Sequence, residues 1–280
     1  MKSVLFTKPK PVTLECLQYL VNQGEQLLGV IVYNQLSYVD SPFTLYCEEH
    51  DVLLYDASEA DAFFEENRNR VDMIYCSTFP KRLKREWLEA AKIAAINFHS
   101  APLPKYRGVF GYNFAFLNQE DEYGVTCHFL AEQFDEGDVI DVLRFPYDFK
   151  KGSVKELISL ADQHLYRIFC KTYQRFKSGE KVVGRPPNGG VYYSRQDFER
   201  AKETLPGESE ELSLRRVRAF GYPPYEGAYI RLGREKVFLV PEAQYKVLVS
   251  PVDKQTTGGG GRIEELIWKN TTHCAQKGAA

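Results

Sequence analysis

Two side chains that can carry acid–base and hydrogen-bond chemistry, Asn97 and His99, stand two residues apart at the end of an apolar run. A histidine titrates near neutral pH and can take up a proton, and an asparagine amide can donate an N–H to a developing oxyanion. Residues 100–108, SAPLPKYRG, follow at once, and their prolines and glycine are typical of a rigid turn. The same pair is also common at strand ends for structural reasons, so a further partner is needed to indicate chemistry.

Asp135 is a candidate for that partner, because it stands with Gly137 in a short turn between two apolar runs, VTCHFLAE and VIDVLRF. An isolated Asp-x-Gly turn is usually structural. A carboxylate beside an imidazole can nevertheless hold its protonated form by charge and hydrogen bonding. His128 lies within the run before this turn, two residues after Thr126, and we interpret it as a core residue.

The elements that would position these residues alternate along the first half of the chain. Short apolar or β-branched runs predict strands at 3–7, 27–33, 51–56, 71–77 and 93–98, and amphipathic segments between them predict helices at 13–24, 57–70 and 81–92. This alternation indicates an α/β fold with a mostly parallel sheet. Asn97, His99 and Ser77 then fall at the carboxyl ends of strands, where such sheets bind ligands. No GxGxxG follows the first run, so no dinucleotide cofactor is indicated.

The second half changes character near residue 180. A helix over 111–118, strands over 123–132 and 139–145, and a long amphipathic helix over about 153–177 come first. Residues 178–190 are rich in glycine and proline and predict a boundary. We therefore expect a catalytic domain over 1–180 and a small β-rich carboxyl-terminal domain over 190–280, whose glycine-rich tail is frayed at its end.

Composition limits the function classes. The chain has 280 residues, 44% of them hydrophobic and 26% charged, which is ordinary for a globular protein. Its net charge of -2 supplies no general attraction for nucleic acid. No run is long and apolar enough to predict a signal peptide or a membrane span, so we expect a cytoplasmic protein. Six scattered cysteines form no ligand pattern, and we expect no metal.

Taken together, the motifs resemble those of the formyltransferases that use 10-formyltetrahydrofolate. That superfamily carries an Asn-x-His motif, a Ser-x-x-Leu-Pro loop with Arg-Gly, a Gly-Val-Thr strand and an Asp-x-Gly turn. The matching residues here are Asn97-Phe-His99, Ser100-Ala-Pro-Leu103-Pro104-Lys-Tyr-Arg107-Gly108, Gly124-Val125-Thr126 and Asp135-Glu-Gly137. The likeness covers residues 1 to about 180 in layout and is sharpest over 96–140. It implies a Rossmann-like amino-terminal formyltransferase domain.

The resemblance also implies an N-formyltransferase with Asn97, His99 and Asp135 as its catalytic residues. In such an enzyme an amine attacks the formyl carbon, loses a proton and leaves negative charge on the formyl oxygen, which suits an amide donor, a histidine base and a carboxylate. The folate cosubstrate would be bound largely by main-chain groups, at positions that correspond to Ser77, Phe79, Ala131 and Glu132. Arg107 could contact the substrate or brace its loop.

The acceptor amine has to be read from the second half. The segment RRVRAFGYPPYEGAYI, residues 215–230, resembles sugar N-formyltransferases that act on nucleotide-linked amino sugars. Tyr222 and Tyr225 could stack on a base or a sugar, or could form a rigid aromatic corner. Related sugar enzymes often carry an aromatic residue before Tyr-Pro-Pro, whereas this chain has Gly221, which leaves the stacking partner open.

The predicted function is therefore formyl transfer from 10-formyltetrahydrofolate to a nucleotide-linked 4-amino-4,6-dideoxy or 3-amino-3,6-dideoxy hexose, for surface polysaccharide such as lipopolysaccharide O-antigen. One alternative is a formyltransferase acting on methionyl-tRNA, an amino acid or a carrier-bound amine. Another is a folate- or sugar-nucleotide-binding protein without turnover. We expect the partners to be folate and the nucleotide sugar, with no nucleic acid or membrane, and a homodimer is one assembly to consider.

Overall fold

The computed structural model describes residues 1–222, 225–242 and 245–246. Its centre is a seven-stranded sheet in the order β3-β2-β1-β4-β5-β7-β8. These strands are β1 (Lys2–Thr7), β2 (Gln26–Val32), β3 (Leu54–Asp56), β4 (Met73–Ser77), β5 (Ala94–His99), β7 (Glu122–Phe129) and β8 (Val139–Pro146). The first five strands in this order run parallel, β7 pairs antiparallel with β5, and β8 pairs antiparallel with β7. This confirms the predicted α/β fold with a mostly parallel sheet.

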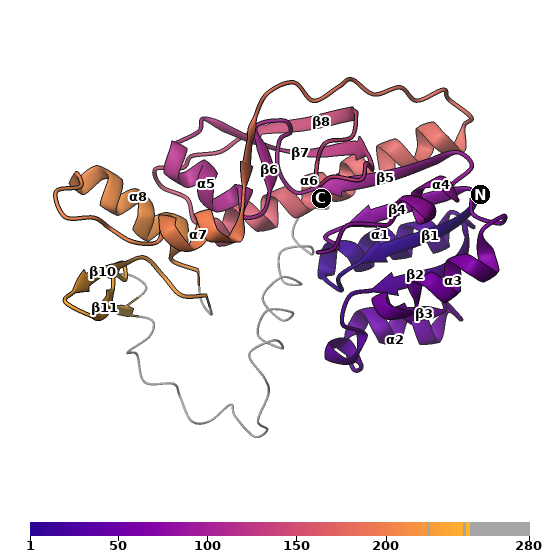
Figure 1. Cartoon of the computed structure of the whole chain (residues 1–280), viewed down its shortest axis with the longest axis horizontal. Helices are drawn as coiled ribbons and strands as arrows, with labels where there is room; N and C mark the ends of the chain where they lie inside the picture. Colours follow the sequence, from indigo (N-terminus) through magenta and orange to yellow (C-terminus); the bar gives the residue numbers. More distant parts are fainter. Residues whose placement is uncertain (223–224, 243–244, 247–280) are drawn as a thin grey trace, which may run out of the picture.

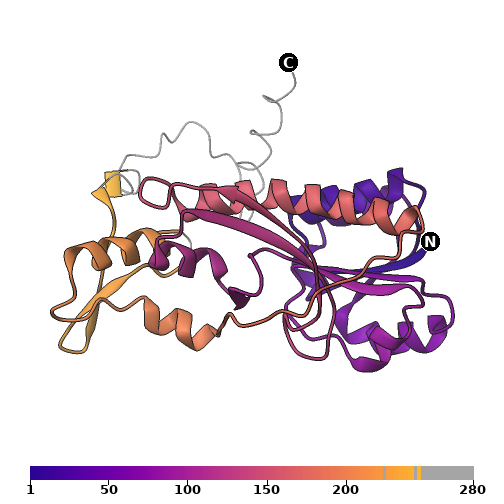
Figure 2. The same cartoon turned by 90° about the horizontal axis from the view of Figure 1, so that it is seen from above.

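Helices cover both faces of the sheet and create two apolar layers. One layer involves α1 (Pro11–Asn22), α2 (Pro42–Glu49), α5 (Gly111–Asn118) and α6 (Val154–Lys177), and the other involves α3 (Ala60–Asn67) and α4 (Arg85–Glu89). Figure 2 shows α1 and α6 side by side. Short 3₁₀ turns at η1 (Gln35–Tyr38) and η2 (Ala57–Glu59) precede α2 and α3.

The helices differ from the predicted ranges at their ends. The helix predicted over 57–70 is divided into η2 and α3, and the helix predicted over 81–92 shortens to α4. Helix α2 lies where no helix is predicted. Ser41 caps its start, because its hydroxyl accepts from the amide of Thr44, and Pro42 is its first residue. The residue at which a helix begins or ends depends on local capping interactions, which side-chain periodicity alone does not predict.

Strand β5 presents its two polar residues to one face because its side chains alternate. Ile96 and Phe98 are buried, and the Phe98 ring lies 4.7 Å from that of Phe169 in α6. Asn97 and His99 point to the opposite side and are half-buried. Packing of the apolar residues against α6 thus fixes the direction in which the polar pair points.

Helix α6 agrees with its predicted range to within one residue. Ser153 and Glu156 form a reciprocal capping box at its start. Its apolar side is buried at Val154, Leu157, Ala161, Leu165, Ile168 and Phe169, and Ile158 is partly buried. Helix α6 therefore packs against the face of the sheet opposite to Asn97 and His99.

After α6 the chain runs back beside residues of the first half, and it then forms further helices and a hairpin. It forms β9 (Val191–Tyr193), α7 (Arg195–Ala201), α8 (Glu210–Phe220) and the antiparallel hairpin of β10 (Tyr229–Leu232) and β11 (Glu235–Phe238). Figure 1 shows the segment between α6 and β9 passing along the top edge of the molecule. Strand β9 then pairs with β6 (Tyr106–Gly108), which lies apart from the central sheet.

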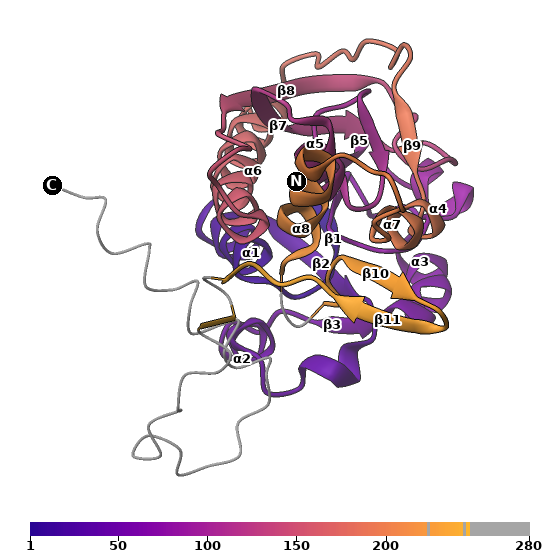
Figure 3. The same cartoon turned by 90° about the vertical axis from the view of Figure 1, so that its left-hand side faces the viewer.

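The hairpin β10–β11 confirms the predicted small β region, to which α7 and α8 add two helices that lie near it in Figure 3. Phe198, Phe220 and Ala228 from this part belong to the same buried cluster as α6. The division into domains at 1–180 and 190–280 stays a prediction. The tail predicted to be frayed lies outside the described residues. Over the described ranges, no helix has both the length and the apolar character needed to cross a membrane.

Candidate active site

The site is built around the end of β5, where the loop that follows it is held tightly. The hydroxyl of Thr126 donates to the carbonyl of Ala101 at 2.8 Å and accepts from the amide of Leu103 at 2.9 Å. Thr126 is also the cross-strand neighbour of His99 in the antiparallel pair of β5 and β7. The threonine of the Gly-Val-Thr segment therefore ties the proline-containing loop to β7 beside His99.

Asp135 comes to the same point from the turn between β7 and β8. Its backbone has a positive φ of 56°, a conformation that aspartate tolerates better than most residues. Gly137 is required two residues later, because a Cβ there would lie 1.8 Å from the Phe129 carbonyl oxygen. The turn brings Asp135 Oδ1 to 3.4 Å from His99 Nδ1, while Oδ2 accepts from the Gly108 amide at 2.8 Å.

The carboxyl of Asp135 is nearly buried, with 6% of its side chain exposed. Burial by itself would raise its pKa, because it disfavours the charged form. Attraction to His99 and His128 when their rings are protonated, together with the hydrogen bond from the Gly108 amide, outweighs burial and lowers the pKa of Asp135 to about 2. Asp135 is therefore an ionised carboxylate across the neutral pH range.

His128 has the buried position that we predict for it. It is buried, but its ring faces the polar cluster: Nδ1 lies 2.7 Å from the Phe129 carbonyl oxygen and Nε2 lies 3.0 Å from Asn97 Nδ2. Because a carbonyl only accepts, Nδ1 carries a proton and Nε2 of the neutral ring accepts from the Asn97 amide. Nε2 is also 3.5 Å from Asp135 Oδ1.

The structure thus brings together all three residues predicted to be catalytic, and adds a fourth. Asn97, His128, Asp135 and His99 form a continuous chain of contacts with spacings of 3.0, 3.5 and 3.4 Å. His128 is the direct cross-strand partner of Asn97. In the sequence, the position of His128 two residues after Thr126 indicates only that both side chains lie on one face of β7. The pairing register between β5 and β7 is what sets His128 beside Asn97.

The positions predicted to bind folate lie on two loops that touch each other. Ser77 ends β4 with a buried hydroxyl that has no hydrogen-bond partner within the described chain, and Phe79 packs edge-on against Phe6 at 5.2 Å. Ala131 and Glu132 follow β7. Arg82 donates to Gln133 at 2.9 Å and Arg85 lies 3.6 Å from Glu132, so side-chain contacts hold the loops together.

The residues predicted to bind the acceptor are more dispersed. Arg107 lies in β6, its Nη1 is 3.3 Å from Glu136, and its Nε is buried without a hydrogen-bond partner among the described residues. Tyr222 follows α8, is half-buried, and stacks on the exposed Tyr225 with 5.8 Å between ring centroids. These residues do not join the Asn97–Asp135 cluster by any hydrogen bond within the described chain.

A charged group on α6 lies close to Tyr222. Burial, Tyr225 and the negative charge of Asp162 raise the pKa of the Tyr222 phenol. Burial raises the pKa of Asp162 itself to about 6, although the positive charge of Lys10, the residue before α1, opposes it. Tyr222 therefore lies within reach of the charge of Asp162 on α6, and it packs against the main buried cluster.

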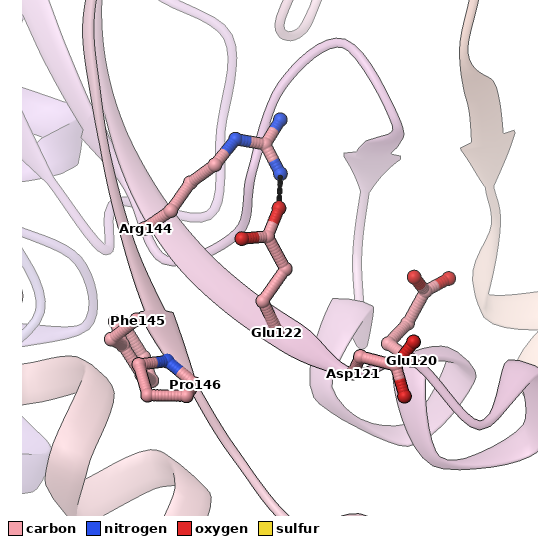
Figure 4. Close-up of a pocket in the computed structure, with 6 residues that line it drawn as sticks. All are labelled: Glu120, Asp121, Glu122, Arg144, Phe145 and Pro146. Atoms are coloured by element: carbon pink, nitrogen blue, oxygen red, sulfur yellow. Dashed lines mark hydrogen bonds and ion pairs between the residues drawn. The ribbon is translucent and has the colours of Figure 1, made fainter.

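The open pocket in Figure 4 lies elsewhere. It is lined by residues 120–122 at the start of β7 and by Arg144, Phe145 and Pro146 at the end of β8, and an Arg144–Glu122 ion pair of 2.7 Å crosses it. It contains none of the predicted site residues. Within the described residues, no group of histidine, cysteine and carboxylate side chains is arranged to hold a metal.

The chain is similar to known formyltransferases. Residues 36–158 match the formyl transferase family. The methionyl-tRNA formyltransferase of Lactobacillus delbrueckii subsp. bulgaricus is 28% identical over 245 residues, 82% of this chain and 75% of that protein. The chain is therefore an N-formyltransferase. Residues 36–158 thus carry the likeness to the formyl transferase family.

Two solved structures share the fold. An N-formyltransferase from Helicobacter canadensis, in complex with folinic acid and dTDP-3-aminofucose, superimposes with a TM-score of 0.68 at 22% identity, covering 85% of this chain and 86% of that one. A 4-N formyltransferase from Francisella tularensis gives a TM-score of 0.71 at 18% identity, covering 86% and 97%. At these identities the likeness establishes the architecture.

Proposed function

We propose that this protein transfers the formyl group of 10-formyltetrahydrofolate to the amine of a nucleotide-linked amino-dideoxy sugar, with Asn97, His99 and Asp135 as its catalytic residues. The observation that carries the proposal is the continuous Asn97–His128–Asp135–His99 contact chain at the end of β5. It combines an amide donor, a histidine and an ionised carboxylate, which are the three groups that formyl transfer requires.

The chemistry follows from these groups. The acceptor amine attacks the formyl carbon, and the formyl oxygen gains negative charge, which an Asn97 N–H stabilises. One amide hydrogen of Asn97 is engaged by His128 Nε2, so the ring fixes the amide plane and leaves the second hydrogen for the substrate. His99 takes the proton from the amine, Asp135 stabilises the imidazolium, and the proton returns to the departing folate nitrogen.

Ser77, Phe79, Ala131 and Glu132 are proposed to form the folate site, mostly through backbone groups. The two loops that carry them are linked by the Arg82–Gln133 and Arg85–Glu132 contacts, so they can present a shared surface. Ser77 Oγ is buried without a partner in the described chain, and an unpaired buried hydroxyl is costly unless a water or ligand satisfies it. The relative from Helicobacter canadensis was solved with folinic acid.

The acceptor is the point at which the comparisons diverge. The relatives by sequence include methionyl-tRNA formyltransferases, whereas the similar structures include a complex with dTDP-3-aminofucose and a 4-N formyltransferase. A tRNA enzyme needs a surface that neutralises phosphates, and the net charge of -2 does not favour one. We therefore place the nucleotide-linked amino sugar first and methionyl-tRNA second.

The experiment that tests the function offers purified protein 10-formyltetrahydrofolate together with dTDP-linked 3-amino and 4-amino sugars, and in parallel methionyl-tRNA. We expect formylated nucleotide sugar by mass spectrometry, and a folate analogue should bind by calorimetry and raise the melting temperature. Formylation of methionyl-tRNA alone would select the second candidate. Folate binding without any turnover on these acceptors would instead support a binding protein.

Tyr222 is proposed to contact the sugar or the base, and Tyr222→Ala tests this placement. Loss of ring area and stacking is expected to cost about 1 to 3 kcal/mol of acceptor binding, so the KM for the nucleotide sugar should rise while the KM for folate stays nearly unchanged. Tyr222→Phe, which keeps the ring, should retain most of the affinity. A lower melting temperature with both KM values unchanged would show that Tyr222 only packs the corner.

Arg107 and Tyr225 are the other residues proposed for the acceptor. Arg107 has a buried Nε with no hydrogen-bond partner among the described residues, which suits a contact to a phosphate or sugar oxygen. Tyr225 is 62% exposed beside Tyr222 and can extend the stacking surface. We also propose that the product is used for surface polysaccharide. The homodimer and the separate domain over 190–280 are further parts of this proposal.

A further inference from the structure

We propose that β9, which lies about 90 residues after His99 in the chain, is a positioning element for catalysis: its pairing with β6 holds His99 with the proton on Nε2 and leaves Nδ1 as the basic nitrogen. This inference rests on the proposed function, because it assigns a base atom to that reaction. It also assigns a role to a short strand that directly follows the boundary predicted at residues 178–190.

The first step concerns the His99 ring. Its Nε2 lies 2.8 Å from the backbone carbonyl oxygen of Tyr106. A carbonyl oxygen has no hydrogen to donate, so Nε2 must carry the proton in this contact. In the neutral ring Nδ1 is then unprotonated, and it is Nδ1 that faces Asp135 Oδ1 at 3.4 Å. A proton accepted at Nδ1 is stabilised at once by the carboxylate.

The second step is that β6 holds both members of this pair. The carbonyl of Tyr106 contacts His99, and the amide of Gly108, two residues later, donates to Asp135 at 2.8 Å. One three-residue strand therefore fixes the imidazole from one side and the carboxylate from the other. A shift of this strand would disturb both contacts together.

The third step is what holds β6 itself. It lies outside the seven-stranded sheet, and its strand partner is β9, with Tyr106, Arg107 and Gly108 opposite Val191, Tyr192 and Tyr193. The amide of Val191 donates to the Lys105 carbonyl at 3.3 Å, and the amide of Val109 donates to the Tyr193 carbonyl at 3.0 Å. Parallel pairing with β9 thus sets where β6 lies.

Side chains strengthen this pairing. The ring of Tyr193 stacks on Phe114 of α5 at 3.8 Å and on Tyr106 at 5.7 Å. The Tyr106 hydroxyl donates to Glu120 at 2.6 Å and accepts from Asn118 at 2.9 Å. Tyr106 is therefore fixed at its side chain by α5 and the following turn, and at its backbone by β9, which leaves its carbonyl little freedom to move from His99.

The approach of the two segments is close enough to require glycine. Gly190 has a φ of +83°, and a Cβ there would lie 1.7 Å from the Pro104 carbonyl oxygen. Gly189, its neighbour, has a similar φ of +78°, but a Cβ there would meet nothing within 4 Å. The two positions impose nearly the same backbone strain on alanine and differ in the clash alone.

This difference supplies a matched pair of variants, Gly190→Ala and Gly189→Ala. Gly190→Ala should push β9 off β6 and misplace the Tyr106 carbonyl, and a displacement of about 1 Å at a catalytic group can cost about a hundredfold in rate. We expect kcat of Gly190→Ala to fall at least about tenfold, with the KM values for folate and acceptor changing less than about twofold. Gly189→Ala should keep kcat near that of the wild type.

The direct readout is the tautomer of His99, observed by ¹H–¹⁵N correlation spectra of protein labelled at histidine. The five histidines of the chain can be assigned by comparison with His99→Asn. We expect a protonated Nε2 in the wild type and in Gly189→Ala, and loss of that form in Gly190→Ala. If Gly190→Ala does not fold, Tyr193→Ala against Tyr193→Phe repeats the comparison, because only the first removes the stacked ring.

Two results would overturn the proposal: a wild-type His99 protonated on Nδ1 when neutral, or a β9 variant that folds and retains both the Nε2–H signal and the wild-type kcat. Failure of the proposed function is separate and recognisable. If the wild type formylates no amino sugar, the acceptor assignment fails, whereas the tautomer and its dependence on Gly190 can still be read in the absence of any substrate.

Discussion

His99→Asn is expected to lower kcat by at least about a hundredfold, the usual scale for loss of a general base. The imidazole is the group in the contact chain that can take up a proton near neutral pH and hold it beside a carboxylate. Asparagine cannot accept that proton, because its amide nitrogen is not basic. The loss should appear in kcat measured with saturating folate and acceptor.

The fold should survive this change, because the His99 side chain is 14% exposed at a strand end and is not part of the apolar core. His50→Asn is the matched control: His50 is an exposed residue that follows α2 and contacts Tyr46. Its kcat and melting temperature should equal those of the wild type. A His99→Asn enzyme with nearly normal kcat would show that another group takes the amine proton.

Asp135→Asn is expected to reduce kcat by a comparable factor, at least about a hundredfold, because the imidazolium formed in the reaction loses its charged partner. Asparagine is nearly isosteric and, like aspartate, tolerates the positive φ of 56° at this position. Its amide oxygen can still accept from Gly108. The kinetic loss should therefore report the charge, and a kcat within a few-fold of the wild type would exclude a role for that charge.

The same variant tests the lowered pKa of Asp135 through stability. Because the folded-state pKa is about 2 against an ordinary value of 3.8, ionisation of Asp135 stabilises the fold above pH 4, and this contribution is lost as the pH falls from about 4 toward 2. This lowering of the pKa of Asp135 corresponds to about 2 kcal/mol of stability.

Urea unfolding of wild type and Asp135→Asn between pH 5 and pH 2 measures this contribution, since titration of all other groups is common to both proteins. The stability advantage of the wild type should shrink by about 2 kcal/mol over that interval. Asp40→Asn, at an exposed residue outside the site, is measured in parallel to show the effect of losing any one carboxylate. A pH-independent difference between wild type and Asp135→Asn would mean that the carboxyl titrates normally.

Much of this protein follows from local pattern. Side-chain periodicity predicts the strands, the long helix α6 and the direction of Asn97 and His99. Alternate residues of a strand share one face, and the face that carries the apolar residues is buried in the core. The Asp-x-Gly turn could also be predicted from the sequence, because Asp135 and Gly137 occupy backbone positions that few other residues tolerate. Resemblance of these motifs to a superfamily supplied the expected triad.

What the tertiary structure alone decided lies in groups that have no signature in the sequence. The Tyr106 carbonyl and the Gly108 amide are backbone atoms that every residue carries, so their roles beside His99 and Asp135 follow only from where β6 lies. His128 joins the site because antiparallel register sets it opposite Asn97, and a one-residue slip would turn it away. The pairing of β9 with β6 depends on contacts between segments about 85 residues apart, which local periodicity does not encode.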